Sequence, residues 1–83
     1  MFELRISTRA EKQIKKLKKE NQIEIIEVLA ELKENPLLGK PLSRELDRRF
    51  SYRFGINRII YKVNTQDKIV DVLSAGHRSR VYN

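Results

Sequence analysis

The spacing of apolar residues changes along this chain in a way that restricts the folds it can adopt. Residues 2–6 alternate apolar and charged side chains, which is the period of a half-buried strand. From Ala10 to Leu32 the apolar residues recur every three or four positions, which is the period of a helix. From residue 50 the alternation returns in short runs. The sequence therefore predicts one strand, a helical region and then further strands.

The helical region contains start and stop signals for two helices. Ser7 or Thr8 is expected to cap the first, with an acidic residue three positions after Thr8, and this helix is predicted to end near Glu20. Asn21 is expected to cap the second, and Asn35-Pro36 ends it because proline disfavours a helical conformation in the residue before it. The second helix is predicted to have a broad apolar face made of Ile23, Ile25, Ile26, Leu29, Ala30 and Leu32.

A loop is expected over residues 36–47, followed by strands at 50–54, 57–63 and 69–73 and a short polar tail from Gly76. In the middle strand Ile59, Tyr61 and Val63 share one face, and Arg58, Ile60 and Lys62 share the other. The predicted order is β-α-α-β-β-β in a single domain over residues 1–83. Because the helices are segregated from most strands, the predicted fold class is α+β.

Composition removes several classes of protein. The absence of cysteine excludes a disulfide scaffold and a thiolate zinc site, and the single histidine, His77, argues against a histidine metal cluster, so we expect no metal or cofactor. No apolar run approaches the ~20 residues of a membrane span, so we expect a cytoplasmic protein without a membrane partner. The 18 Lys and Arg against 11 Asp and Glu give a net charge of +7, which favours a polyanionic partner.

The positive charge falls in two parts of different character. Before residue 21 the bases are mostly lysines on the first predicted helix, where they are typical of a solvated face. Residues 21–35 carry a net charge of −3, and their four glutamates are expected to face solvent. Beyond Pro36 the bases are mainly arginines, whose planar guanidinium suits phosphate. The second half of the chain is therefore the expected location of chemistry.

The candidates for chemistry lie near the predicted sheet and the C-terminus: Arg53, Arg58, His77, Arg78, Arg80 and Tyr82. Arg58 stands inside an apolar strand, where a cation costs free energy unless it is paired or faces solvent. It is either a phosphate ligand or the ion-pair partner of Asp71 on the adjacent strand. The other candidates can also be interpreted without a catalytic role. The arginines would then be exposed side chains, the histidine a surface residue, and the tyrosine a residue that fills the edge of the core.

Together these groups suit RNA cleavage by the adjacent 2′-OH without a metal ion. In that reaction arginines stabilise the developing charge of the phosphate. A histidine can exchange a proton near neutral pH, and a tyrosine can exchange a proton or stack on a base.

Several motifs follow one another in a characteristic order. They are Ser7-Thr8-Arg9-Ala10-Glu11-Lys12, Leu38-Gly39-Lys40-Pro41-Leu42, Ser51-Tyr52-Arg53-Phe54-Gly55, Asn57-Arg58-Ile59-Ile60-Tyr61, and Gly76-His77-Arg78 with Val81-Tyr82. In this order, over nearly the whole chain, they resemble the RelE/ParE superfamily of bacterial and archaeal toxins, and its RelE branch more closely. The resemblance implies a small, mainly antiparallel sheet with a helical hairpin packed on one face and the active cleft on the other.

The resemblance also implies a function. The chain is expected to be the toxin of a type II toxin–antitoxin system, an endoribonuclease that cleaves mRNA in the ribosomal A site by 2′-OH attack on the scissile phosphate. Its partners would be the ribosome, the A-site mRNA and a cognate antitoxin with an acidic, partly disordered segment. Two other functions stay open: a ParE-like inhibitor of DNA gyrase that acts by binding, and a non-catalytic basic RNA-binding module.

Residue roles follow from the same resemblance. Arg58 corresponds to the strand arginine that contacts the scissile phosphate, Arg78 to a second phosphate-stabilising arginine, and Tyr82 to a tyrosine that stacks on or helps to activate the substrate. Arg53 lies where relatives carry a basic residue on the preceding strand, and His77 lies where some relatives carry a lysine. The residues expected to contact RNA or the ribosome are Lys12, Lys15, Lys16, Lys19, Arg48, Arg49 and Arg80.

Overall fold

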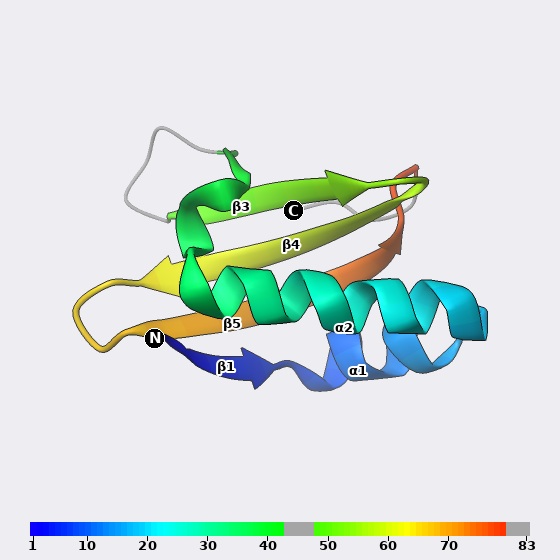
Figure 1. Ribbon diagram of the computed structural model, residues 1–83, viewed down its shortest axis with the longest axis horizontal. Coiled ribbons are helices and arrows are strands. Elements are labelled where there is room, and N and C mark those ends of the chain that lie inside the picture. Colours follow the sequence, from blue (N-terminus) through cyan, green and yellow to red (C-terminus); the bar gives the residue numbers. More distant parts are fainter. Residues whose placement is uncertain (43–47, 80–83) are drawn as a thin grey trace.

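The computed structural model describes residues 1–42 and 48–79 and forms an α+β fold with a single mixed sheet (Figure 1). The described elements follow the order β1 (Glu3–Ile6), α1 (Thr8–Lys15), α2 (Lys19–Glu34), the 3₁₀ helix η1 (Pro36–Leu38), β2 (Lys40–Pro41), β3 (Arg49–Phe54), β4 (Asn57–Asn64) and β5 (Ile69–His77). The strands lie in the order β1-β5-β4-β3-β2. Strand β1 is parallel to β5, and every other neighbouring pair is antiparallel. The predicted fold class is confirmed.

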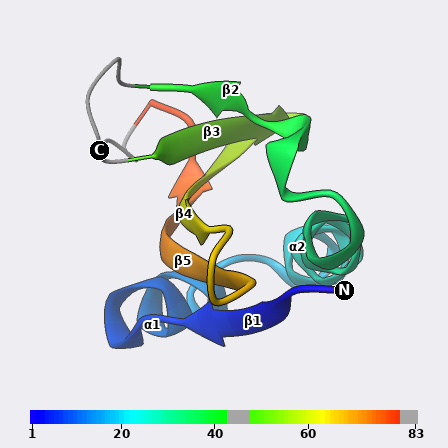
Figure 2. The same ribbon diagram turned by 90° about the vertical axis from the view of Figure 1, so that its left-hand side faces the viewer.

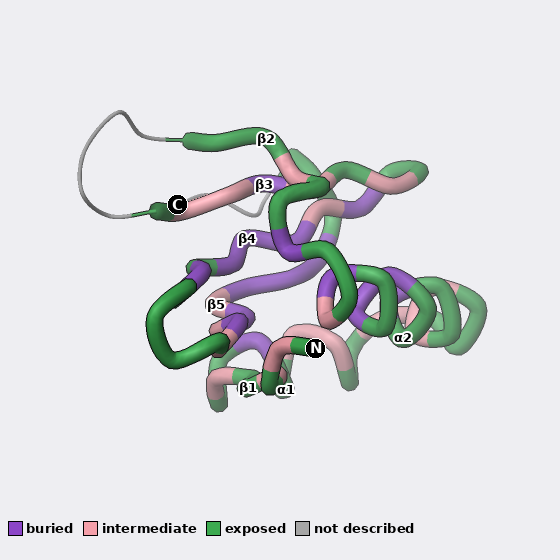
Figure 3. The backbone as a smooth tube through the Cα atoms, turned by 60° about the vertical axis from the view of Figure 1, so that its left-hand side comes forward, coloured by how far each residue is buried: buried purple, intermediate pink, exposed green. Residues whose placement is uncertain are grey.

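Helix α2 lies across one face of the sheet, as the end-on view in Figure 2 shows. Its buried residues Ile25 and Leu32 belong to one apolar cluster with Tyr61 of β4 and Val72 of β5, and each of these four side chains is fully buried. Figure 3 shows the buried positions gathered along β4, β5 and one side of α2. The opposite face of the sheet, which α2 does not cover, is called the open face below.

Helix α1 continues from β1 along the edge of β5. The Ser7 hydroxyl donates a hydrogen bond to the Leu73 carbonyl, and the Ala75 amide donates to Gln13 Oε1, at 3.0 and 2.9 Å. These contacts satisfy backbone groups of β5 beyond the end of β1. Strand β5 is therefore held on both sides as far as Ala75.

The helix boundaries differ from the prediction. Helix α1 ends at Lys15 instead of near Glu20, and α2 begins at Lys19 instead of after Asn21. A 3₁₀-type turn closes α1, and Gln22 Nε2 then donates to the Leu17 carbonyl at 2.9 Å, which satisfies an acceptor that a longer helix would have used. This tertiary bond to a side chain of the next helix is invisible to local periodicity.

Only half of the expected apolar face of α2 is buried. Ile25, Leu29 and Leu32 pack on the sheet, whereas Ile23 and Ile26 are 53% and 65% exposed. Two further differences concern strands. The segment predicted as a loop contains η1 and the short strand β2, and β5 continues through Gly76 to His77 instead of ending at residue 73.

Candidate functional site

Alternation along β3 and β4 directs a set of polar side chains onto the open face. Arg53 is the cross-strand partner of Arg58, and Ser51 is the partner of Ile60. Since cross-strand Cα atoms are ~5 Å apart, the two arginines stand side by side on neighbouring strands. On its other side Arg58 is paired with Gly76 of β5, so the residue directly opposite it on β5 has no side chain.

The arginine pair borders a groove with a volume of about 580 Å³. Its walls are Leu38, Gly39, Lys40, Pro41, Leu42, Ser51, Tyr52, Arg53 and Arg58. Arg53 is exposed and Arg58 is half-buried. The groove therefore joins two guanidinium groups, which prefer phosphate oxygens, to an apolar wall suited to a base or a sugar.

The alternative interpretation of Arg58 as an ion-pair partner of Asp71 is wrong. Asp71 is the cross-strand partner of Lys62, whereas Arg58 is the partner of Gly76. Four residues of β4 separate the two positions, which corresponds to about 13 Å along the strand.

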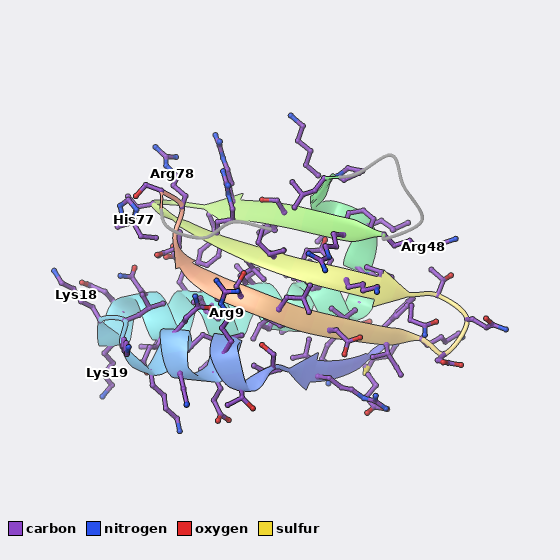
Figure 4. All side chains as sticks on the ribbon, turned by 180° about the vertical axis from the view of Figure 1, so that it is seen from behind. Arg9, Lys18, Lys19, Arg48, His77 and Arg78 are labelled. Atoms are coloured by element: carbon purple, nitrogen blue, oxygen red, sulfur yellow. The ribbon has the colours of Figure 1, made fainter. Side chains whose placement is uncertain are left out.

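Arg78 and His77 lie at the end of the sheet where β3 and β4 are joined, and both are exposed (Figure 4). The Arg78 amide donates to the Ile56 carbonyl at 2.8 Å, which ties the residue after β5 to the β3–β4 turn. Arg58 lies two residues after Ile56, so the structure brings Arg53, Arg58 and Arg78 to the same end of the sheet.

His77, a candidate for proton transfer, is the last residue of β5. Its cross-strand partner is Asn57, which is buried, and its neighbour Ala75 belongs to the core beneath α2. Alternation therefore directs His77 toward the side of the sheet that α2 covers. Its Nδ1 atom accepts a hydrogen bond from the Ser79 amide at 3.1 Å and lies 2.6 Å from Ser79 Oγ.

The residues expected to contact RNA or the ribosome are distributed over several surfaces. Lys12, Lys15, Lys16 and Lys19 are all exposed on α1, at its end, or at the start of α2. Arg49 is half-buried opposite Lys62, and Arg48 lies at the end of the sheet opposite to Arg78 (Figure 4), where it donates to Thr65 Oγ1 at 3.3 Å. Arg80 and Tyr82 fall outside the described residues.

The open face carries two more basic residues, to which the sequence alone assigned no role. Lys40 is the cross-strand partner of Ser51 and lines the groove. Arg9 projects from α1 beside β5 when the molecule is seen from behind (Figure 4). Arg9 belongs to the motif at residues 7–12, and Lys40 belongs to the motif at residues 38–42. Their place on the open face depends on the pairing of β2 with β3 and on the path of α1, which no local signal specifies.

Tyr61 fixes the wall of the groove that η1 and β2 form. Its hydroxyl donates to the Pro36 carbonyl at 2.7 Å and accepts from the Gly39 amide at 2.9 Å. Burial raises the pKa of this hydroxyl, the Gly39 bond lowers the pKa by a smaller amount, and Tyr52 also raises it. A Cβ atom at residue 39 would lie 2.5 Å from the Tyr61 hydroxyl oxygen, so the close approach requires glycine.

In residues 1–42 and 48–79, no helix is long and apolar enough to cross a membrane. Across the same two ranges, no group of three His, Asp or Glu side chains is placed to hold a metal ion.

The chain is similar to known toxins in sequence and in structure. The sequence model of the family described as ParE toxin of type II toxin–antitoxin system, parDE, matches residues 4–82. Toxin RelG from Mycobacterium tuberculosis is 32% identical over 83 residues, which cover 98% of this chain and 95% of that toxin.

Solved structures agree with this relationship. The toxin–antitoxin complex RelBE2 from M. tuberculosis matches with a TM-score of 0.83 and 33% identity, over 93% of this chain and 98% of the other. The isolated RelE toxin of E. coli matches with a TM-score of 0.82 and 23% identity over 98% of this chain and 88% of that one, and so supports the fold alone. The chain therefore belongs to the ParE toxin family of type II toxin–antitoxin systems, within the RelE/ParE superfamily that its motifs resemble.

Proposed function

We propose that this toxin is a ribosome-dependent endoribonuclease that cuts mRNA in the A site. The observation that carries the proposal is the side-by-side pair Arg53 and Arg58 bordering a groove, with Arg78 tied to the same end of the sheet. Two guanidinium groups on the groove and a third at the same end of the sheet fit a phosphodiester under attack, because the phosphorane-like transition state carries more negative charge than the substrate.

The proposed reaction uses the RNA itself as the nucleophile. The 2′-oxygen attacks the adjacent phosphorus, the bond from phosphorus to the 5′-oxygen breaks, and the products are a 2′,3′-cyclic phosphate and a 5′-hydroxyl. The attacking hydroxyl loses a proton, and the leaving oxygen gains one. Arg53 and Arg58 would hold the non-bridging oxygens, and Arg78 would stabilise the charge from the end of the sheet. Tyr82 is proposed to stack on a base next to the scissile phosphate.

The lysines of α1 are proposed to make the contact with the ribosome. Lys12, Lys15 and Lys16 are exposed on or just after one helix, so they offer a charged surface outside the groove. Contacts of this kind neutralise phosphates without reading sequence, and their contribution falls as salt rises. This function also places the protein in the cytoplasm, where translation occurs.

A cognate antitoxin is the proposed protein partner. The related toxins of M. tuberculosis and E. coli were solved in complexes with antitoxins. The open face carries the cations Lys40, Arg53 and Arg58, and an acidic, partly disordered segment would neutralise them while it covers the groove.

The experiment that tests the catalytic proposal is cleavage of mRNA on programmed ribosomes by purified toxin. Arg58→Ala and Arg78→Ala are each expected to lower the cleavage rate by about 10²–10³, the loss found when one charge-stabilising donor is removed from an active site. The matched control for the Arg58→Ala, Arg78→Ala double variant is the double variant Lys33→Gln, Lys68→Asn. It also removes two positive charges, and it leaves the open face unchanged. Asparagine suits residue 68 because its φ is 56°. If the Arg58→Ala, Arg78→Ala double variant is folded and cleaves as fast as wild type, the proposed site is wrong.

Inhibition of DNA gyrase is the second candidate, because the family model that matches residues 4–82 is that of the ParE toxins. A gyrase supercoiling assay separates the two functions. The endoribonuclease proposal expects unchanged supercoiling at toxin concentrations that cleave mRNA. Inhibited supercoiling with intact mRNA would favour the ParE-like function instead.

A further inference from the structure

The short turn at residues 77–79 holds Arg78 from two sides. On one side the Arg78 amide donates to the Ile56 carbonyl of the β3–β4 turn at 2.8 Å. On the other, the Ser79 amide donates to His77 Nδ1 at 3.1 Å, and Ser79 Oγ lies 2.6 Å from the same nitrogen. The side chain of His77 therefore closes the turn that carries Arg78.

These contacts determine how the imidazole is used. A backbone amide can only donate a hydrogen bond, so Nδ1 must present its lone pair to Ser79. In the neutral ring the proton then sits on Nε2. A general base would have to accept a proton at a nitrogen with a free lone pair. At Nδ1 the lone pair is occupied by the turn, and at Nε2 it is occupied by the proton.

The strand register leads to the same conclusion. Arg58 is opposite Gly76 on the open face, whereas His77 is opposite the buried residue Asn57. One residue along a strand reverses the direction of the side chain. His77 is therefore directed away from the face on which Arg53 and Arg58 stand.

We propose that His77 is a positioning residue that acts through Ser79 to hold Arg78 at the end of the open face. The inference rests on the proposed function in one respect, namely that Arg78 contacts the phosphate. Arg78 is exposed and lies just beyond β5, so its backbone position depends on the bond to Ile56 and on the closure of the turn. Pre-organisation of a charged group is a large part of its effect on a transition state, because a displaced guanidinium loses most of its stabilising contact.

Replacement of His77 by asparagine distinguishes a positioning role from a role in proton transfer. The shorter amide side chain would offer its Oδ1 atom to the amide two residues later, which is the contact of an Asx turn, and it exchanges no proton. We expect His77→Asn to keep kcat within about threefold of wild type, since the turn stays closed. We expect His77→Ala to lower kcat by about 10- to 100-fold while KM for programmed ribosomes changes less than about threefold, since binding by the lysines is unaffected.

Ser79→Ala is the companion variant. It removes the hydroxyl contact at 2.6 Å but keeps the amide, so it is expected to lower kcat less than His77→Ala does. Equal losses of kcat in His77→Asn and His77→Ala would overturn the proposal, because a group required for proton transfer cannot be replaced by an amide.

A measurement on the free protein separates this inference from the proposed function. Imidazole ¹⁵N chemical shifts of wild type should show the Nε2–H tautomer, and the Arg78 amide should exchange with solvent more slowly in wild type and His77→Asn than in His77→Ala. If wild type cleaves no mRNA but these differences are seen, the proposed function fails and the role of His77 in the turn is supported. If the Arg78 amide exchanges equally fast in all three proteins, the positioning role is wrong.

Discussion

The hydroxyl of Tyr61 is the single polar group on which the wall of the groove most depends. It donates to the carbonyl of Pro36, the first residue of the 3₁₀ helix, and accepts from the amide of Gly39, which joins this helix to β2. The ring itself is fully buried and stacks on Phe50 with a centroid distance of 5.5 Å. Tyr61→Phe keeps this packing and removes only the hydroxyl, so its effect measures the two hydrogen bonds.

The magnitude follows from what the substitution leaves behind. The Pro36 residue is buried, so its carbonyl loses a partner that water cannot easily replace, at a cost of about 1–3 kcal/mol. The Gly39 amide is half-buried and regains part of its solvation, so its loss is nearer to about 1 kcal/mol. The sum is about 2–4 kcal/mol, against a total free energy of unfolding of roughly 4–12 kcal/mol for a chain of this length.

Urea unfolding followed by circular dichroism is the appropriate assay. The midpoint should fall while the slope m stays constant, because the surface exposed on unfolding hardly changes. Tyr52→Phe is the matched control: Tyr52 is on the neighbouring strand, and its hydroxyl makes no hydrogen bond among the described residues. A loss below about 0.5 kcal/mol in Tyr61→Phe, or an equal loss in both variants, would contradict the assignment of the two bonds.

Two further predictions concern pH and the start of α1. Burial raises the pKa of folded Tyr61 above its ordinary value of 10.0, so its contribution to stability is fully present below pH 10 and is lost as the pH rises through the folded pKa. The stability difference between wild type and Tyr61→Phe should therefore shrink in unfolding curves measured above pH 10. A difference that grows above pH 10 would mean that folding lowers the pKa of Tyr61, contrary to this prediction. Ser7 Oγ accepts from the Ala10 amide at 3.0 Å as the N-cap of α1 and donates to Leu73, so Ser7→Ala should cost about 1–2 kcal/mol. Thr8→Ala should cost less, and the reverse order in thermal unfolding would assign the cap to Thr8.

Local patterns predicted the central strands well because alternate residues of each pack beneath α2, although Ile60 on the other face is buried as well. Ile59, Tyr61 and Val63 all belong to the core, and Arg58 and Lys62 face the other way, as the sequence predicted. Between Ile60 and Tyr61 the register with β5 shifts by one residue.

The site could be predicted only in part. The presence of Arg58 on a strand follows from periodicity, but its partner depends on the register, and the sequence offered Asp71 where the structure has Gly76. Strand β2 was missed for a related reason. It is only two residues long, contains Pro41, and forms because Tyr61, distant in sequence, holds the preceding segment. The sequence therefore did not predict that Lys40 of this strand lines the groove.

Two arginines of the proposed site, Arg58 and Arg78, are held in place by very different numbers of contacts, and this predicts different responses to mutation. Arg58 lies on β4, which is paired on both sides, so its position is part of the global fold. Arg78 lies beyond β5 and depends on a few hydrogen bonds of one turn. Changes in the core beneath β4 should thus alter stability and activity together, whereas changes in the turn at residues 77–79 should alter activity at nearly constant stability. A variant of this turn should therefore lose the proposed activity although its free energy of unfolding stays close to that of wild type.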